Sequence, residues 1–125
     1  MESPRARPAM TRLRNLTLHR QKEQEIRIAR EAGFDLVAEP AGVGVGPGER
    51  GLEDAAARLE ALLRECGARG ECVLLGGHTG VWVAAVMRLL AAGTAPPPLY
   101  CFDTRRVHDQ NGRFIFVPEG LVRVC

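Results

Sequence analysis

Three short segments carry the residue types that could bind or cleave a phosphate ester. The first is Gly76-Gly77-His78-Thr79-Gly80, which follows an apolar run and precedes an apolar helical pattern. Glycines permit close approach to the backbone, and free amides at a helix start carry partial positive charge that favours an anion. The segment lacks the lysine of a P-loop and the spacing of a dinucleotide fingerprint. The alternative is a glycine-rich turn in which His78 or Thr79 caps the helix.

The other two segments combine polar and basic residues. Thr17-Leu18-His19-Arg20 offers a hydroxyl, an imidazole and a guanidinium to a phosphodiester, with ordinary loop polarity as the alternative explanation. In Asp103-Thr104-Arg105-Arg106, adjacent arginines point to opposite sides of an extended chain. One arginine could therefore reach a phosphate while the other pairs with Asp103.

The elements that position these segments follow from the apolar pattern. Short apolar runs predict strands over residues 13–18, 34–38, 72–75 and 99–102, and composition or three-four spacing predicts helices over 21–32, 52–66 and 81–92. Asn111-Gly112 is a tight-turn pair that predicts a C-terminal β-hairpin, with residues 121–124 as an edge segment. Because parallel strands need helical crossovers, this order predicts a Rossmann-like, three-layer α/β domain with a mostly parallel sheet. Ligands of such sheets bind beyond the carboxyl ends of the strands, where all three segments are expected.

The length of 125 residues suits one domain. Residues 1–9 contain prolines and arginines and predict a flexible N-terminal tail, with Met10 as an alternative start and a single domain over residues 10–125. Residues 41–51 contain five glycines and a proline, which favour a flexible lid or linker over a phosphate loop.

Composition excludes several classes of protein. With 46% hydrophobic and 26% charged residues, the chain fits a soluble globular protein, and a net charge of +2 is too small to attract long nucleic acids or a membrane surface. The longest apolar stretch, residues 81–92, is well short of the roughly 20 residues that span a bilayer. No secretory signal pattern is present, so a cytoplasmic location is expected. The four cysteines, Cys66, Cys72, Cys101 and Cys125, form no CxxC pair, so neither a disulfide framework, a metal nor another cofactor is expected.

A family resemblance rests on these motifs. The run Cys72-Val73-Leu74-Leu75-Gly76-Gly77-His78-Thr79-Gly80, the apolar helix, Pro98-Leu99-Tyr100 and Asp103-Thr104-Arg105-Arg106 before an Asn-Gly turn resemble the small stand-alone CRISPR-associated ring nucleases. These enzymes are similar to a minimal CRISPR-associated Rossmann-fold sensor domain, and the likeness spans residues 13–124. It implies a homodimer that binds cyclic oligoadenylate, most often the four-membered ring, across its two-fold axis. Cleavage of the ring would switch off type III CRISPR signalling. His78-Thr79 departs from the acidic or aromatic pair expected after the glycines.

The resemblance also implies a chemistry. The ring carries its own nucleophile, the ribose 2′-hydroxyl, so cleavage to linear products with a 2′,3′-cyclic phosphate needs positioning and charge stabilisation more than a metal. His19 or His78 is expected to move a proton, and Arg105 or Arg106 to stabilise charge. The residues expected to bind the ligand are Thr17, Gly76, Gly77, His78, Thr79, Gly80, Asp103 and Thr104. The helix over residues 81–92, apolar nearly all round, is the expected dimer surface. A non-catalytic nucleotide-binding module and an assembly protein remain as alternatives.

Overall fold

The apolar runs form one five-stranded sheet in the computed structural model, which describes residues 10–125. The elements are β1 (Thr11–Asn15), α1 (Glu23–Glu31), β2 (Phe34–Leu36), α2 (Gly48–Ala68), β3 (Cys72–Leu74), α3 (Thr79–Ala91), β4 (Leu99–His108) and β5 (Phe114–Arg123). The strand order is β2-β1-β3-β4-β5, and only β5 is antiparallel to its neighbour. The predicted α/β class, with a mostly parallel sheet and a C-terminal hairpin, is therefore confirmed. The predicted N-terminal tail, residues 1–9, lies outside the described residues.

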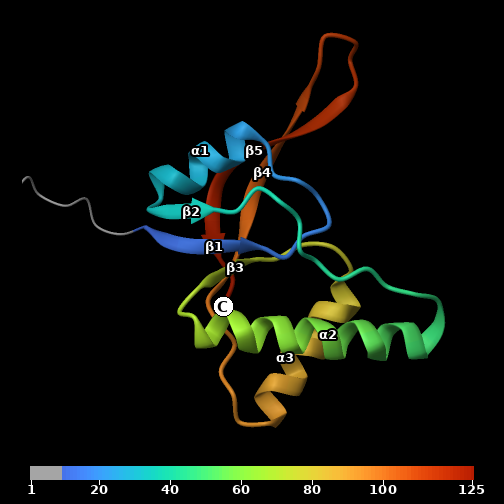
Figure 1. The fold of residues 1–125 in the computed structure, drawn as a ribbon. Coiled ribbons are helices and arrows are strands. Elements are labelled where there is room, and N and C mark those ends of the chain that lie inside the picture. Colours follow the sequence, from blue (N-terminus) through green and yellow to red (C-terminus); the bar gives the residue numbers. More distant parts are fainter. Residues whose placement is uncertain (1–9) are drawn as a thin grey trace, which may run out of the picture.

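Helices cover both faces of the sheet (Figure 1). Helix α1 packs on one face, where Ala29 meets Leu13 and Leu74 in a buried cluster. Helices α2 and α3 pack on the other face, where the leucines at positions 59 and 63, one turn apart, contact α3 and Val73 of β3. The burial of these stripes follows the three-four spacing of the sequence. None of the three helices has the length and apolar character needed to cross a bilayer.

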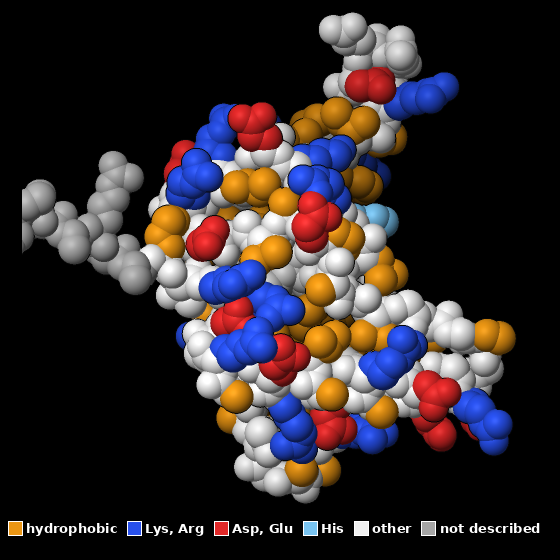
Figure 2. All heavy atoms as spheres, in the orientation of Figure 1, with side chains coloured by type: hydrophobic (Ala, Val, Ile, Leu, Met, Phe, Trp, Pro, Cys, Tyr) orange, Lys and Arg blue, Asp and Glu red, His pale blue; other side chains and the backbone are white. Residues whose placement is uncertain are grey.

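Charged side chains join neighbouring elements at two points. Glu60 of α2 accepts hydrogen bonds from Arg88 of α3 at 2.6 Å and from Arg64 at 3.1 Å, and these bonds hold the pKa of the Glu60 carboxyl below its usual value. Glu71 is buried just before β3 and pairs with Arg12 and Arg14 of β1, each at 3.3 Å. Elsewhere, acidic and basic side chains alternate over α1 and α2, with no field of one sign on the face shown in Figure 2.

The glycine-rich segment differs from its predicted form. Helix α2 begins at Gly48, four residues before the predicted start, because Gly51 has no side chain and the chain at Gly46 lies against it; a Cβ at Gly51 would be 2.3 Å from the Gly46 oxygen. The backbone amide of Ala41 donates to the Asn15 carbonyl oxygen at 2.8 Å, and that of Gly42 donates to the Thr17 carbonyl oxygen at 3.0 Å. Residues 41–42 are therefore bonded across the end of β1 and do not form a free linker.

Strand β4 is longer than predicted. The sequence ends it at Phe102, but it continues to His108, and its outer half pairs with Phe114–Pro118 beyond a bulge at Asp103/Thr104. We call residues 103–118 the arm, because they extend away from the rest of the sheet (Figure 1). Its turn is closed by Asp109, whose Oδ1 accepts hydrogen bonds from the amides of Asn111 and Arg113, each at 2.8 Å. The segment Asp103-Thr104-Arg105-Arg106, expected where this strand ends, therefore lies within the strand.

The contact at Gly42 gives a stability prediction. A Cβ at this position would lie 2.4 Å from the Thr17 oxygen, so Gly42→Ala must displace backbone, and we expect a loss of about 2–3 kcal/mol in the free energy of unfolding. Gly44→Ala is the matched control, because nothing lies within 4 Å of its Cβ position, and it should change stability by less than about 0.5 kcal/mol. Urea denaturation measures both, and equal effects would contradict the packing described.

Candidate anion-binding site at the carboxyl edge of the sheet

The strand order creates one place where successive crossovers diverge. Strands β1 and β3 are neighbours, but β1 leads to α1 on one face of the sheet and β3 leads to α3 on the other. In open α/β sheets the crevice at such a switch point, outside the carboxyl ends of the strands, is where ligands bind. A cavity of about 250 Å³ lies there, lined by the loops after β1 and β3 and by Cys101 and Phe102 of β4.

A buried polar network gives the loop after β1 its shape. The Asn15 Oδ1 accepts hydrogen bonds from the Thr17 amide at 3.1 Å and the Thr17 hydroxyl at 2.6 Å. Its Nδ2 donates to the carbonyl oxygens of His19 at 2.9 Å and Ala38 at 3.0 Å. Because both ends of the Asn15 amide are occupied, the orientation of this side chain is fixed, and it joins the loop after β1 to the loop after β2.

Thr17 lines the cavity, but its hydroxyl belongs to this network. Its hydroxyl donates to Asn15 and accepts from the His19 amide at 3.1 Å and from Gln21 Nε2 at 3.2 Å. Its methyl group packs on Gly76, where a Cβ would be only 2.9 Å away. Thr17, expected to contact ligand, is thus placed at the site, but its hydroxyl is used in positioning the two loops against each other.

Gln21 is a site residue that the sequence reading missed. It is 7% exposed and lines the cavity, and its Nε2 donates to Thr17 and to the His19 oxygen at 3.2 Å. If the amide group were rotated by about 180°, its oxygen would face the His19 carbonyl oxygen, so the nitrogen is the atom that bonds there. The other atom, Oε1, is buried and has no partner among the described residues. A buried acceptor without a donor costs about 1–3 kcal/mol, and a hydroxyl or amino group of a ligand would satisfy it.

The glycines after β3 present a donor to the same cavity. The Gly76 carbonyl accepts from Trp82 Nε1 at 2.7 Å, on the α3 side of the sheet. Because a trans peptide places C=O and N–H on opposite sides, the Gly77 amide points away from Trp82, and Gly77 itself lines the cavity. Gly77 has φ +99°, which favours glycine, and Leu18 packs over it. Gly76 and Gly77, which are expected to bind ligand, line the cavity.

The rest of the glycine segment serves the helix. His78 is the N-cap of α3, and its Nδ1 accepts from the Val81 amide at 3.3 Å, so the capping alternative is confirmed for this residue. Its ring lies against Gly80, where a Cβ would be 2.9 Å from Cε1. His78, Thr79 and Gly80 do not line the cavity at the switch point.

The Asp103-to-Arg106 segment also lies outside the cavity, on the arm. Arg105 Nε pairs with Glu119 at 3.0 Å, so the expected pairing of an arginine with Asp103 is wrong. The guanidinium of Arg106 lies over the Phe114 ring, 4.3 Å from its centroid. The structure therefore brings together the first two predicted segments and places the third on a neighbouring projection.

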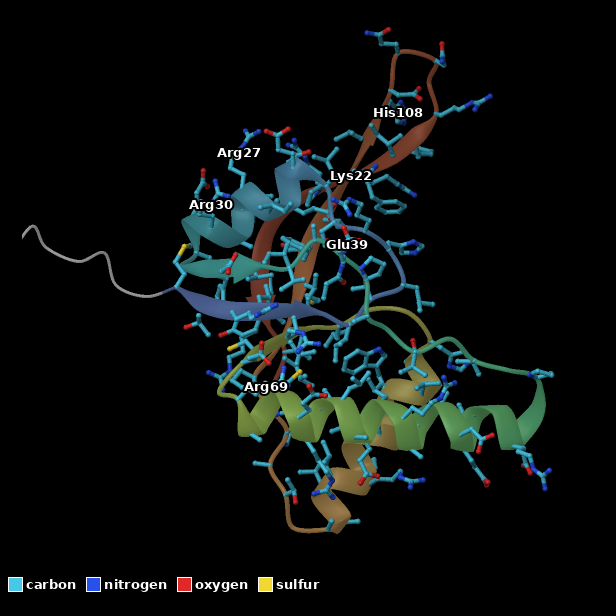
Figure 3. The ribbon with its side chains drawn as sticks, viewed as in Figure 1. Lys22, Arg27, Arg30, Glu39, Arg69 and His108 are labelled. Atoms are coloured by element: carbon cyan, nitrogen blue, oxygen red, sulfur yellow. The ribbon has the colours of Figure 1, made fainter. Side chains whose placement is uncertain are left out.

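His19 is the imidazole that lines the cavity. Its backbone is held on both sides by the network, whereas its side chain is exposed. The neighbouring Arg20 is paired with Glu39, which follows β2 (Figure 3). The cavity thus combines an amide donor, an unpaired carbonyl oxygen and an imidazole.

A larger cavity, about 560 Å³, lies at the opposite edge of the sheet, between the end of α2 and residues 94–98. Its charged groups are occupied, because Arg64 is bonded to Glu60 and Thr94, and Glu71 is bonded to Arg12 and Arg14. Among the described side chains that line it, no buried nitrogen or oxygen atom is unpaired, so the smaller cavity is the better candidate site. Within residues 10–125, no group of three or more His, Cys, Asp or Glu side chains is arranged to hold a metal ion.

Comparison with known proteins adds no family to this description: no protein-family model and no curated protein matches the chain.

Loss of the Thr17 hydroxyl tests the network. We expect Thr17→Val to lower the free energy of unfolding by about 1–3 kcal/mol, because it leaves the His19 amide without its acceptor and removes one of the two acceptors of Gln21 Nε2. Thr104→Val makes the same change on the exposed arm and should have an effect below about 0.5 kcal/mol. If urea denaturation gives equal losses for the two variants, the network does not hold the loop.

Proposed function

We propose that the protein is a ring nuclease that binds cyclic oligoadenylate, foremost the four-membered ring, at this cavity and cleaves it without a metal ion. The proposal places the chain among Rossmann-like domains that resemble CRISPR-associated sensor domains. The observation that carries it is the set of three groups in one cavity: the Gly77 amide, the unpaired Gln21 Oε1 and the His19 imidazole. An adenine ribonucleotide has complementary groups: an anionic phosphate oxygen for the amide, the amino group of the base for the glutamine and the 2′-hydroxyl for His19.

These groups suit attack by the ribose on its own phosphate. The 2′-hydroxyl oxygen bonds to the adjacent phosphorus, and the bond from phosphorus to the 5′-oxygen breaks. The proton of the 2′-hydroxyl passes to His19, which returns it to solvent, and the leaving 5′-oxygen takes a proton from solvent. The Gly77 amide stabilises the charge that develops on the phosphoryl oxygens. The products are linear, with a 2′,3′-cyclic phosphate at one end and a 5′-hydroxyl at the other.

A homodimer through α3 is part of the proposal. Val83, Met87 and Leu90 of α3 are each more than half exposed, and α3 borders an apolar groove of about 270 Å³ that extends to Val124. Leu75 lines both this groove and the candidate cavity. A second copy seated on the groove would therefore bring two cavities close to one two-fold axis, which matches the symmetry of a cyclic ligand.

Sequestration of the ring without cleavage is the second candidate function. It is favoured by the position of the other predicted catalytic groups, because His78 caps α3 and the two arginines lie on the arm. His19 is then the imidazole at the cavity that accepts the proton, and the leaving oxygen must take its proton from solvent.

Cleavage is tested with cyclic tetra-adenylate in the presence of EDTA, with the products separated by chromatography. We expect linear products from the wild-type protein and a loss of about 100-fold or more in the cleavage rate of His19→Ala, because the proton acceptor is removed. His78→Asn is the matched control: asparagine also caps helices, so the imidazole is lost with the cap retained, and the rate should stay within about threefold of wild type.

Each result assigns a function. Binding of the ring without turnover selects sequestration, whereas absence of both binding and turnover overturns the two proposals and leaves the assembly protein. A His78→Asn variant as inactive as His19→Ala would move the proton transfer to the start of α3.

A further inference from the structure

The two faces of the arm differ in chemistry. Residues directly opposite in an antiparallel pair share a face, and the register places Arg106 opposite Phe116 and His108 opposite Phe114. We call these four residues the cationic–aromatic face. The reverse face carries Val107 opposite Ile115, and Arg105, which is paired with Glu119.

The cationic–aromatic face is preorganised. The Arg106 guanidinium lies over the Phe114 ring at 4.3 Å, and the His108 ring meets the same ring edge-on at 4.3 Å and 74°. Phe114 is 57% exposed and Phe116 is 70% exposed. Figure 2 shows apolar side chains along the arm with Lys and Arg side chains beside them. Arg106, Phe114 and His108 are therefore held by one another, and large ring surfaces of Phe114 and Phe116 stay in contact with water.

The chemistry of this face selects among binding partners. Two phenyl rings with a guanidinium and an imidazole suit a planar heterocycle joined to an anion, because bases stack on aromatic rings and arginine adds cation–π and phosphate contacts. A purely apolar partner would strip water from Arg106 and His108 without supplying an opposite charge. Nucleotides provide both the flat ring and the negative charge.

The position of the arm links it to the candidate cavity. Strand β4 leaves the sheet at the carboxyl edge, and Phe102, which lines the cavity, is followed on the same face of the strand by Thr104 and Arg106. At about 3.4 Å per residue, the chain from Phe102 to Arg106 covers about 14 Å. The cavity of about 250 Å³ is smaller than the roughly 300–1,000 Å³ of ordinary ligand pockets, so an oligonucleotide ring must extend beyond it.

We propose that the cationic–aromatic face of the arm is a base-stacking platform for adenines of the ligand whose phosphate lies in the cavity. This rests on the proposed function for the identity of the ligand. Phe116 and Phe114 supply the stacking surfaces, and Arg106 faces the phosphate that joins the stacked nucleotide to the next.

The test compares matched truncations on the two faces of the arm. Affinity for cyclic tetra-adenylate is measured by calorimetry for the wild-type protein, Phe116→Ala, Phe116→Tyr and Ile115→Ala. Loss of one stacked base should weaken binding by about 5- to 150-fold in Phe116→Ala. Phe116→Tyr keeps an aromatic ring and should restore the affinity, and Ile115→Ala, an apolar truncation on the reverse face, should stay within about twofold of wild type. The melting temperature of each variant establishes that it is folded.

The outcomes separate this inference from the proposed function. If the wild-type protein binds the ring and Phe116→Ala binds it equally well, the platform is overturned while the proposed function stands. If the wild-type protein does not bind the ring, the proposed function fails, and titration with adenosine 5′-monophosphate followed by NMR decides the platform. Shifts in the Phe116 and His108 signals that exceed those of Ile115 then support a site for adenine nucleotides, and unmoved signals overturn it. A change in sedimentation of Phe116→Ala without a change in affinity makes this face a contact between copies of the chain and also overturns it.

Discussion

The hydroxyl of Thr17 is the point on which the carboxyl edge of the sheet depends. It donates to Asn15 and accepts from the His19 amide and Gln21, so one oxygen atom satisfies three polar groups inside the loop after β1. The same residue touches two other segments, through its carbonyl to Gly42 and through its methyl group to Gly76. Its environment is buried, where hydrogen bonds are strong and unmet polar groups are costly. The loops after β1, β2 and β3 are consequently held as one unit.

This arrangement explains why the candidate site is polar without being an ion-pair cluster. The network occupies the side chains of Asn15 and Thr17, and it leaves Gln21 Oε1 buried without a partner beside the cavity, which the exposed His19 also lines. The glycine segment adds a donor only because Trp82 holds the Gly76 carbonyl on the other side. The groups that face the cavity are therefore set by the packing behind them, as preorganised binding requires.

The sequence predicts the elements of this fold well where burial is periodic and poorly where it is not. The leucine stripe of α2 and the apolar run of β3 are evident because each buries a continuous face. The outer half of β4 escapes prediction because Asp103-Thr104-Arg105-Arg106 is exposed on both faces, and only pairing with β5 makes it a strand. The start of α2 at Gly48 escapes prediction for another reason. Glycine disfavours helix, but the close contact between Gly46 and Gly51 requires glycine at position 51.

Within the site, the sequence identifies the segments but not the roles of their residues. The two loops were expected at this edge because strand ends converge there, which is a property of topology. Which hydroxyl is occupied and which amide oxygen is free depends on contacts between residues far apart in sequence, such as Asn15 with Ala38. One feature of the sequence points to Gln21: polar residues stand at positions 15, 17, 19 and 21, so Gln21 continues a series of polar residues at every second position. Helical composition around Gln21 obscured that signal.

The size of the cavity constrains how any larger ligand is held. A volume of about 250 Å³ accommodates part of an oligonucleotide, so the remaining binding surface has to come from the arm or from a second copy. The two sources lie on different sides of the cavity: Phe102 leads to the arm along β4, and Leu75 leads to the groove beside α3. In the proposed dimer the two would act together, because the second copy would double the cavity and each arm would extend the cavity of its own chain. A ligand with two-fold symmetry would then meet each chemical group twice, and repetition would supply affinity that one small cavity cannot.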